Sequence, residues 1–124
     1  MTWSIPLDRF FDDATSDIED DVKGGARVAA QGLNRYTPVD TGRLVGNWQG
    51  AINGDPPNVR LPDDPSRSFS IVFLEAVVEQ FRLGDILAFV NFTPYGGFVN
   101  DGTAKIEPRR FVERAAEDVA NYFS

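Results

Sequence analysis

The stretch TPVDTGRL at residues 37–44 separates a long amphipathic segment from everything that follows it. Pro38 ends a helix, because proline lacks the amide hydrogen that the helix needs and pushes the residue before it out of the helical region. Asp40 and Thr41 can accept hydrogen bonds from nearby backbone N–H groups, and Gly42 tolerates a positive φ. These four residues therefore predict a tight structural turn between a helix and a strand.

Upstream of this turn, apolar residues recur every three or four positions. From Leu7 to Tyr36 they form one stripe of a long helix: Phe11, Ala14, Ile18, Val22, Ala26, Ala29 and Leu33. Gly24 and Gly25 oppose this helix, since each costs about 1 kcal/mol relative to alanine in a helix interior. We therefore expect that the helix bends at these glycines or that another segment packs very close to them.

Downstream of the turn, two further segments have apolar patterns. Residues 43–52 favour a strand loosened by glycines, with a bulky face made by Leu44, Trp48 and Ile52. Residues 66–82 place apolar side chains at helical spacing, and Asp64 or Ser66 is a candidate cap for that helix. The β propensity of residues 71–73 leaves a strand at its start open.

The last third of the chain predicts a buried strand, a turn and a terminal helix. Residues 86–92 are a short apolar run between turn signals, which is typical of a buried strand. Residues 95–103 are rich in turn residues and can hold one helical turn, and we expect Gly102 and Thr103 to form a structural turn. Pro108 suits the first position of a closing amphipathic helix.

Together these elements predict one α+β domain over residues 1–124. We expect the long N-terminal helix and the C-terminal helix to pack on a small, mostly antiparallel β-sheet, with a further helix between its strands. Residues 53–65 contain four prolines and predict an extended, exposed loop. The aromatic residues expected to pack the sheet and the helices together are Trp48, Tyr95 and Phe111.

Composition argues against several kinds of chemistry. The 124 residues are 42% hydrophobic and 12% aromatic, which fits one compact core, and they include no cysteine and no histidine. The chain therefore offers no disulfide, no thiolate ligand and no imidazole base. We expect no enzymatic activity, no metal and no cofactor. No apolar run approaches the roughly 18 residues that a membrane span needs, so we expect a soluble protein with no membrane partner.

Acidic residues leave one enzymatic alternative open. Asp63 and Asp64 follow Pro62, and residues 21–23 have the acid-x-lysine form of many metal-dependent nucleases. Those nucleases place their Pro-Asp element before the acid-x-lysine element, whereas this chain has the reverse order. A nuclease would require metal-dependent cleavage that is lost when Asp63 or Asp64 is changed. Solvated loop acids are the ordinary explanation.

Charge is unevenly distributed along the chain, whose formal net charge is −7. Acids crowd the beginning: Asp8, Asp12, Asp13, Asp17, Glu19, Asp20 and Asp21. Cations gather near the end: Lys105, Arg109, Arg110 and Arg114. Such runs are usually solvated helix faces, and the alternative is head-to-tail complementarity between copies of the chain. The net charge opposes attraction to phosphate backbones, so any contact with DNA would have to be local.

Two arginines and the long loop are the candidate partner contacts. Cations in a first helical turn face the positive end of the helix dipole and lose about 0.3 to 1 kcal/mol there. Either an acid of the same chain or an acidic patch on a neighbouring protein is expected to compensate them. The candidate interface residues are Arg109, Arg110, Asp55, Arg60, Asp63 and Asp64. The runner-up function is a nucleic-acid-binding accessory protein that uses this basic C-terminal segment.

Three elements in this order resemble a known group of phage proteins. They are residues 37–44 with Asn47-Trp48 behind them, residues 84–103, and residues 108–111 before the last helix. At these runs the chain is similar to the tail-completion or neck proteins of double-stranded DNA bacteriophages, the broad group that includes the minor tail protein Z of phage lambda. One departure is visible, because the family often has a glutamate before its Gly-Thr or Gly-Ser pair, where this chain has Asp101.

The resemblance implies a small α+β protein that forms a ring at the junction between head and tail. Its expected partners are other copies of itself in a cyclic homo-oligomer, connector proteins on the portal or adaptor side, and tail or tail-terminator proteins. It implies no catalytic residues and no sequence-specific binding of nucleic acid. The expected location is the neck of the virion, with the host cytoplasm during assembly.

Overall fold

The computed structural model describes the backbone of residues 8–124 and the side chains of residues 16–124. Over this range the chain has the α+β fold that the sequence predicts, with five helices and a two-stranded antiparallel sheet. In chain order the elements are α1 (Asp8–Tyr36), α2 (Arg43–Gly46), β1 (Trp48–Ile52), α3 (Ser68–Glu79), β2 (Leu87–Asn91), α4 (Gly96–Asp101) and α5 (Phe111–Phe123).

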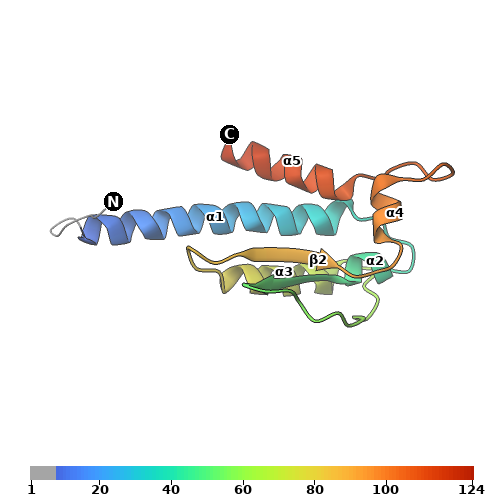
Figure 1. Cartoon of the computed structure of the whole chain (residues 1–124), viewed down its shortest axis with the longest axis horizontal. Helices are drawn as coiled ribbons and strands as arrows, with labels where there is room; N and C mark the ends of the chain where they lie inside the picture. The colour runs from blue at the N-terminus through green and yellow to red at the C-terminus, as the bar shows by residue number, and fades with distance from the viewer. Residues whose placement is uncertain (1–7) are drawn as a thin grey trace.

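The elements form layers on the two sides of α1. Figure 1 shows α1 running along the length of the molecule, with α5 on one side of it and the sheet with α3 on the other. In the sheet, β1 and β2 pair in antiparallel register, with Trp48 opposite Asn91 and Ile52 opposite Leu87. The C-terminal helix packs along α1 and reaches the sheet through its first residue, Phe111, whose ring lies edge-on to Trp48 with centroids 6.1 Å apart.

The core lies where α1, β1, α3 and α5 meet. Its buried residues are Ala30, Leu33, Leu44, Trp48, Leu74, Phe111 and Ala115, and Tyr95 packs against them. The indole N–H of Trp48 donates a hydrogen bond to Thr37 Oγ1 at 2.8 Å, so this polar atom is satisfied inside the core. The bond joins the beginning of β1 to the end of α1 and thereby places the turn between them.

Glycines allow α1 and α5 to approach each other closely. A Cβ added at Gly32 would lie 2.8 Å from the Cβ and 2.9 Å from the Cα of Ala115. At Gly24 and Gly25, an added Cβ would overlap the side chains of Tyr122 and Phe123 at the end of α5. Of the two explanations that the sequence left open for this glycine pair, the close approach of another segment is the one found.

The expected strand over residues 43–52 is wrong in its first half. Residues 43–46 form the single turn α2, and only residues 48–52 are a strand. The reason is the backbone of Gly42, which has φ 89° and starts a helical turn. A hydrogen bond of 3.0 Å from the Gly46 N–H to the Gly42 carbonyl closes this turn. The turn buries Leu44 and Val45, which an extended strand would place on opposite faces.

The expected start of the last helix at Pro108 is also wrong, because α5 begins at Phe111. The N–H groups of Arg109 and Arg110 donate to the carbonyls of Val99 and Asn100, at 3.1 and 3.0 Å, instead of lying free at a helix start. Arg110 has φ 50°, outside the right-handed helical region. The two arginines therefore precede the helix rather than occupying its first turn.

Candidate functional site

Some residues of each run that carried the sequence signal line one hollow at the end of the molecule that holds α2 and α4. It has a volume of about 630 Å³, and we call it the turn groove. Its lining joins three segments that lie far apart in the sequence: residues 38–44 of the turn, Arg60 and Asp63 of the long loop, and Tyr95, Val99 and Arg109. Asp55, Asp64 and Arg110 are not part of this lining.

The turn itself is built around Gly42. Its carbonyl accepts a hydrogen bond from the Asp64 N–H at 2.9 Å, and a Cβ at this position would lie 2.7 Å or less from the backbone of Pro65. Both the positive φ and this contact require glycine. Thr41 Oγ1 accepts a hydrogen bond from the Arg43 N–H at 3.2 Å, while Asp40 is exposed and Pro38 is half-buried. The turn is thus held rigidly against the end of the 53–65 loop.

Three arginines give the turn groove its charge. The Arg43 guanidinium lies over the Tyr95 ring, 5.5 Å from the centroid, and its Nε is buried without a hydrogen-bond partner among the described residues. Arg60 pairs with Asp63 across 3.5 Å at the surface. Arg109 is exposed, and its side chain makes no hydrogen bond or ion pair within residues 16–124. The lining of the groove therefore combines three arginines with Asp40, Asp63 and apolar side chains.

Asp64 caps a helix, which is one of the two roles that the sequence offers for it; the other role, a partner contact, stays a prediction. The residue is 3% exposed, and its Oδ2 accepts hydrogen bonds from the N–H groups of Phe69 and Ser70 at 3.0 and 2.9 Å. Burial by itself raises the pKa of this carboxyl, but the hydrogen bonds from Ser70, Ser66 and Phe69 together outweigh it and hold the pKa below its ordinary value. These bonds serve the free N–H groups at the start of α3.

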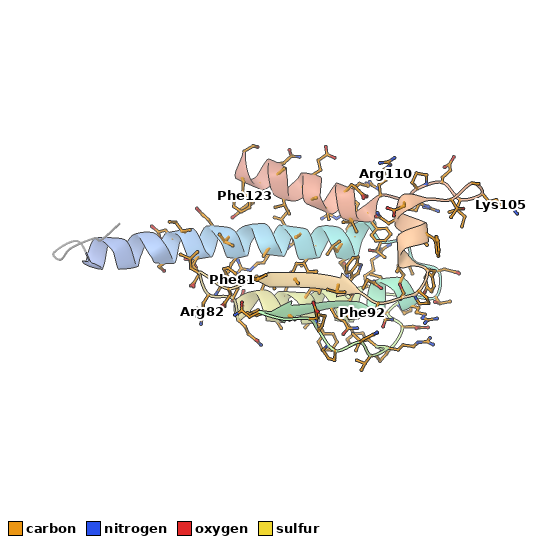
Figure 2. The ribbon with its side chains drawn as sticks, in the orientation of Figure 1. Phe81, Arg82, Phe92, Lys105, Arg110 and Phe123 are labelled. Atoms are coloured by element: carbon orange, nitrogen blue, oxygen red, sulfur yellow. The ribbon has the colours of Figure 1, made fainter. Side chains whose placement is uncertain are left out.

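The second predicted turn closes the loop before α5. Gly102 has φ 81°, and a Cβ there would lie 2.8 Å from Pro108 N. The N–H of Thr103 donates to the Ile106 carbonyl at 2.9 Å, and Thr103 Oγ1 accepts from the Ile106 N–H at 3.1 Å. Together they hold a short loop whose tip carries Lys105, at the end of the molecule opposite to the beginning of α1 (Figure 2).

Polar side chains that sequence reasoning missed hold the loops in place. Asn47 Oδ1 accepts from the Leu61 N–H at 2.7 Å, which ties the long loop to α2. Asn100 Oδ1 accepts from the Val112 N–H at 3.0 Å at the start of α5. Arg67 Nη1 donates to the carbonyls of Asn34, Arg35 and Thr37, and so closes the end of α1. Contacts of this kind join distant segments and leave no periodic signal.

The outer face of α3 is a second candidate surface, which we call the α3 ridge. Phe69, Val72 and Phe73 are 67%, 61% and 61% exposed, although α3 also buries Leu74 and Val78 completely. A hollow of about 340 Å³ lies beside Phe69 and Phe73, between the helix and the end of the long loop. The sequence held a signal for this surface, because the segment SFSIVFLEAVVE is apolar on more than one side and a helix of that kind needs more than one partner.

Within residues 16–124 no three acidic, histidine or cysteine side chains are grouped so that they could hold a metal ion. None of the helices in the described part of the chain is both long enough and apolar enough to cross a membrane.

Comparisons of the chain with models of protein families, with curated proteins and with solved structures find no significant match. The resemblance to phage neck proteins therefore rests on the residues of this chain alone.

Proposed function

We propose that this protein is a structural component of a bacteriophage neck, where identical copies form a ring that joins the head connector to the tail. The observation that carries an assembly role is the α3 ridge. Two phenylalanines and a valine on one exposed helix face form a contiguous apolar patch, and such patches on soluble domains mark surfaces that other proteins cover.

The convergence of the sequence signals supports the same proposal. The three runs that resemble the neck proteins contribute to one place, because residues 38–44, Tyr95 and Arg109 all line the turn groove. These residues build a turn and a hollow lined by three arginines, two aspartates and apolar side chains, rather than a nucleophile with its base. Protein–protein contacts use such a mixture of arginine, other polar and apolar side chains.

The proposal is tested in the phage that encodes the protein. Virions lacking it are expected to accumulate separate filled heads and finished tails, visible by electron microscopy, and the supplied wild-type protein restores joining. The double variant Phe69→Ser with Phe73→Ser is expected to fold but not to restore joining, whereas Gln80→Ala at the end of the same helix restores it. Normal joining in the absence of the protein contradicts the proposal.

One observation favours the second candidate, a nucleic-acid-binding accessory protein. Lys105, Arg109, Arg110 and Arg114 are all exposed at or next to the loop before α5. Binding to DNA through these residues would weaken steeply with salt, because phosphate contacts release counterions. An absence of DNA binding at low salt would exclude this candidate.

A further inference from the structure

The first part of α1 extends past the contacts that α5 and the loop after α3 make with this helix (Figure 1). The end of α5 meets α1 at Gly24 and Gly25, and the loop after α3 reaches it through a hydrogen bond from the Leu83 N–H to Glu19 Oε1 at 2.9 Å. Figure 1 shows the helix continuing past both of these contacts. The segment Asp8–Ile18, which we call the arm, is therefore about 16 Å of helix at 1.5 Å per residue.

The arm is acidic and amphipathic. It contains four aspartates and one arginine, and its sequence places Phe11, Ala14 and Ile18 at spacings of three and four residues. Ile18 is 52% exposed and Asp17 beside it is exposed. Ile18 is thus an apolar residue of this stripe that a groove on another surface can cover.

The turn groove lies at the opposite end of the same molecule, and its lining has a small excess of cations, with three arginines against Asp40 and Asp63. Figure 1 places α2 and α4, which flank the groove, at the far end of the long axis from the start of α1. Arg43 and Arg109 line it without an ion pair to any of residues 16–124, and Val39 and Tyr95 contribute apolar surface. The two arginines without an ion pair, beside apolar side chains, are the groups that an acidic amphipathic helix would contact.

We propose that the arm of one copy docks in the turn groove of the next copy. The two surfaces differ and lie at opposite ends, so the contact is head-to-tail, and repetition of one such contact closes a ring when the rotation between copies allows it. This inference rests on the proposed neck function and identifies the contact that joins the copies. An acidic helix of another protein or a nucleic acid in the groove is the competing outcome.

Cross-linking of the full chain tests this contact directly, because the sequence has no cysteine. The single variants Asp17→Cys and Arg109→Cys are mixed in equal amounts and oxidised, first as pure protein and then within assembled necks. We expect the mixed disulfide dimer to exceed both homodimers by at least about tenfold. The variant Asp55→Cys, exposed but outside the groove, is the matched control and should not cross-link to position 17. Equal amounts of all three dimers, a dominant Asp17→Cys homodimer, or no mixed dimer in either preparation overturns the proposal.

A charge exchange gives an independent readout. Asp17→Arg and Arg109→Asp are each expected to weaken self-association about tenfold in sedimentation experiments, and mixing the two variants should restore it to within about threefold. Both residues are exposed, so the melting temperature should stay unchanged, and Glu117→Arg on α5 serves as the control for a nonspecific charge effect. Weakening that the mixture does not reverse contradicts pairing of arm and groove.

The two proposals can fail separately. Unjoined heads and tails after gene removal, together with necks in which positions 17 and 109 never cross-link, would leave the neck function standing and exclude arm docking. A strong mixed cross-link in a protein whose removal leaves joining intact would support arm docking and exclude the neck function.

Discussion

Two regions of the molecule differ in how their apolar surface is covered. One is the contact between α1 and α5, and the other is the outer face of α3. Along α1, glycines let α5 approach so closely that added methyl groups at Gly24, Gly25 and Gly32 would overlap its side chains or backbone. On α3, Phe69 and Phe73 lie in the open although the opposite side of the same helix is fully buried. The first surface is completed within one chain, whereas the second has no partner among the described residues.

This contrast separates the parts of the molecule that stabilise the fold from those available for assembly. Close packing resists changes of even one methyl group, because interiors are dense and cannot relax freely. An exposed face loses little when it is truncated in the free protein, because water already contacts it. Substitutions at adjacent positions should therefore have very different effects on stability.

The largest effect is expected at Leu74, which is completely buried on the inner side of α3. Leu74→Ala should lower the free energy of unfolding by about 3 kcal/mol, because it removes buried methyl groups and leaves a cavity. Chemical denaturation followed by circular dichroism measures this. A loss below about 1 kcal/mol would contradict the assignment of this face to the core.

Gly32→Val should come next, with a loss of about 2 kcal/mol. The new side chain would meet the backbone of Ala115, which cannot move aside as a flexible side chain can. Gly97→Ala is the matched control, since nothing lies within 4 Å of a Cβ at that position. If both variants melt at the wild-type temperature, α1 and α5 are not in the close contact described above.

Asp64→Ala should cost about 1 to 2 kcal/mol, because the N–H groups of Phe69 and Ser70 lose their acceptor. The pKa of Asp64 is lowered in the folded protein, so its stabilising contribution is present above the ordinary pKa of about 4 and is lost as pH falls through the folded-state value. The difference in stability between wild type and Asp64→Asn should therefore shrink between pH 7 and pH 2. A constant difference across that range would be inconsistent with an ionised cap.

The smallest effect on stability is expected at Phe73, the neighbour of Leu74. Phe73→Ala should change the free energy of unfolding by less than about 0.5 kcal/mol, because the ring is 61% exposed. The same variant should weaken self-association of the protein or the joining of phage heads to tails, measured in the assays proposed above. A large loss of stability would show that the ridge belongs to the core of the single chain.

Much of the architecture follows from local patterns. The end of α1 at Tyr36 was predicted from Pro38, and the strand over residues 86–92 from its apolar run; the structure confirms both, with β2 at Leu87–Asn91. The start of the last helix was misplaced, because the hydrogen bonds of Arg109 and Arg110 to the α4 segment compete with helix formation and have no sequence signature. The glycine pair in α1 was recognised as a choice between a bend and a close contact, and only the position of Tyr122 and Phe123 decides it.

The candidate surfaces were less predictable than the fold. Arg60, Asp63 and Arg109 were named as partner contacts, and the structure brings these three together beside the 38–44 turn. Asp64 was a candidate both for a partner contact and for the cap of α3, and the structure confirms the cap, because its Oδ2 accepts from N–H groups at the start of α3. The apolar residues of α3 are predicted from their helical spacing, but spacing alone does not say which side of a helix that is apolar all round is covered.

By itself, the sequence determined the α+β class, the length of α1 and the turn that ends it, because periodicity and the missing amide hydrogen of proline act over a few neighbouring residues. Only the tertiary structure decided which side of α3 remains open, that Asp64 accepts from the N–H groups of Phe69 and Ser70, and that the turn, Tyr95 and Arg109 share one groove. Those outcomes depend on contacts between segments far apart in the chain, and such contacts follow from packing rather than from any local pattern.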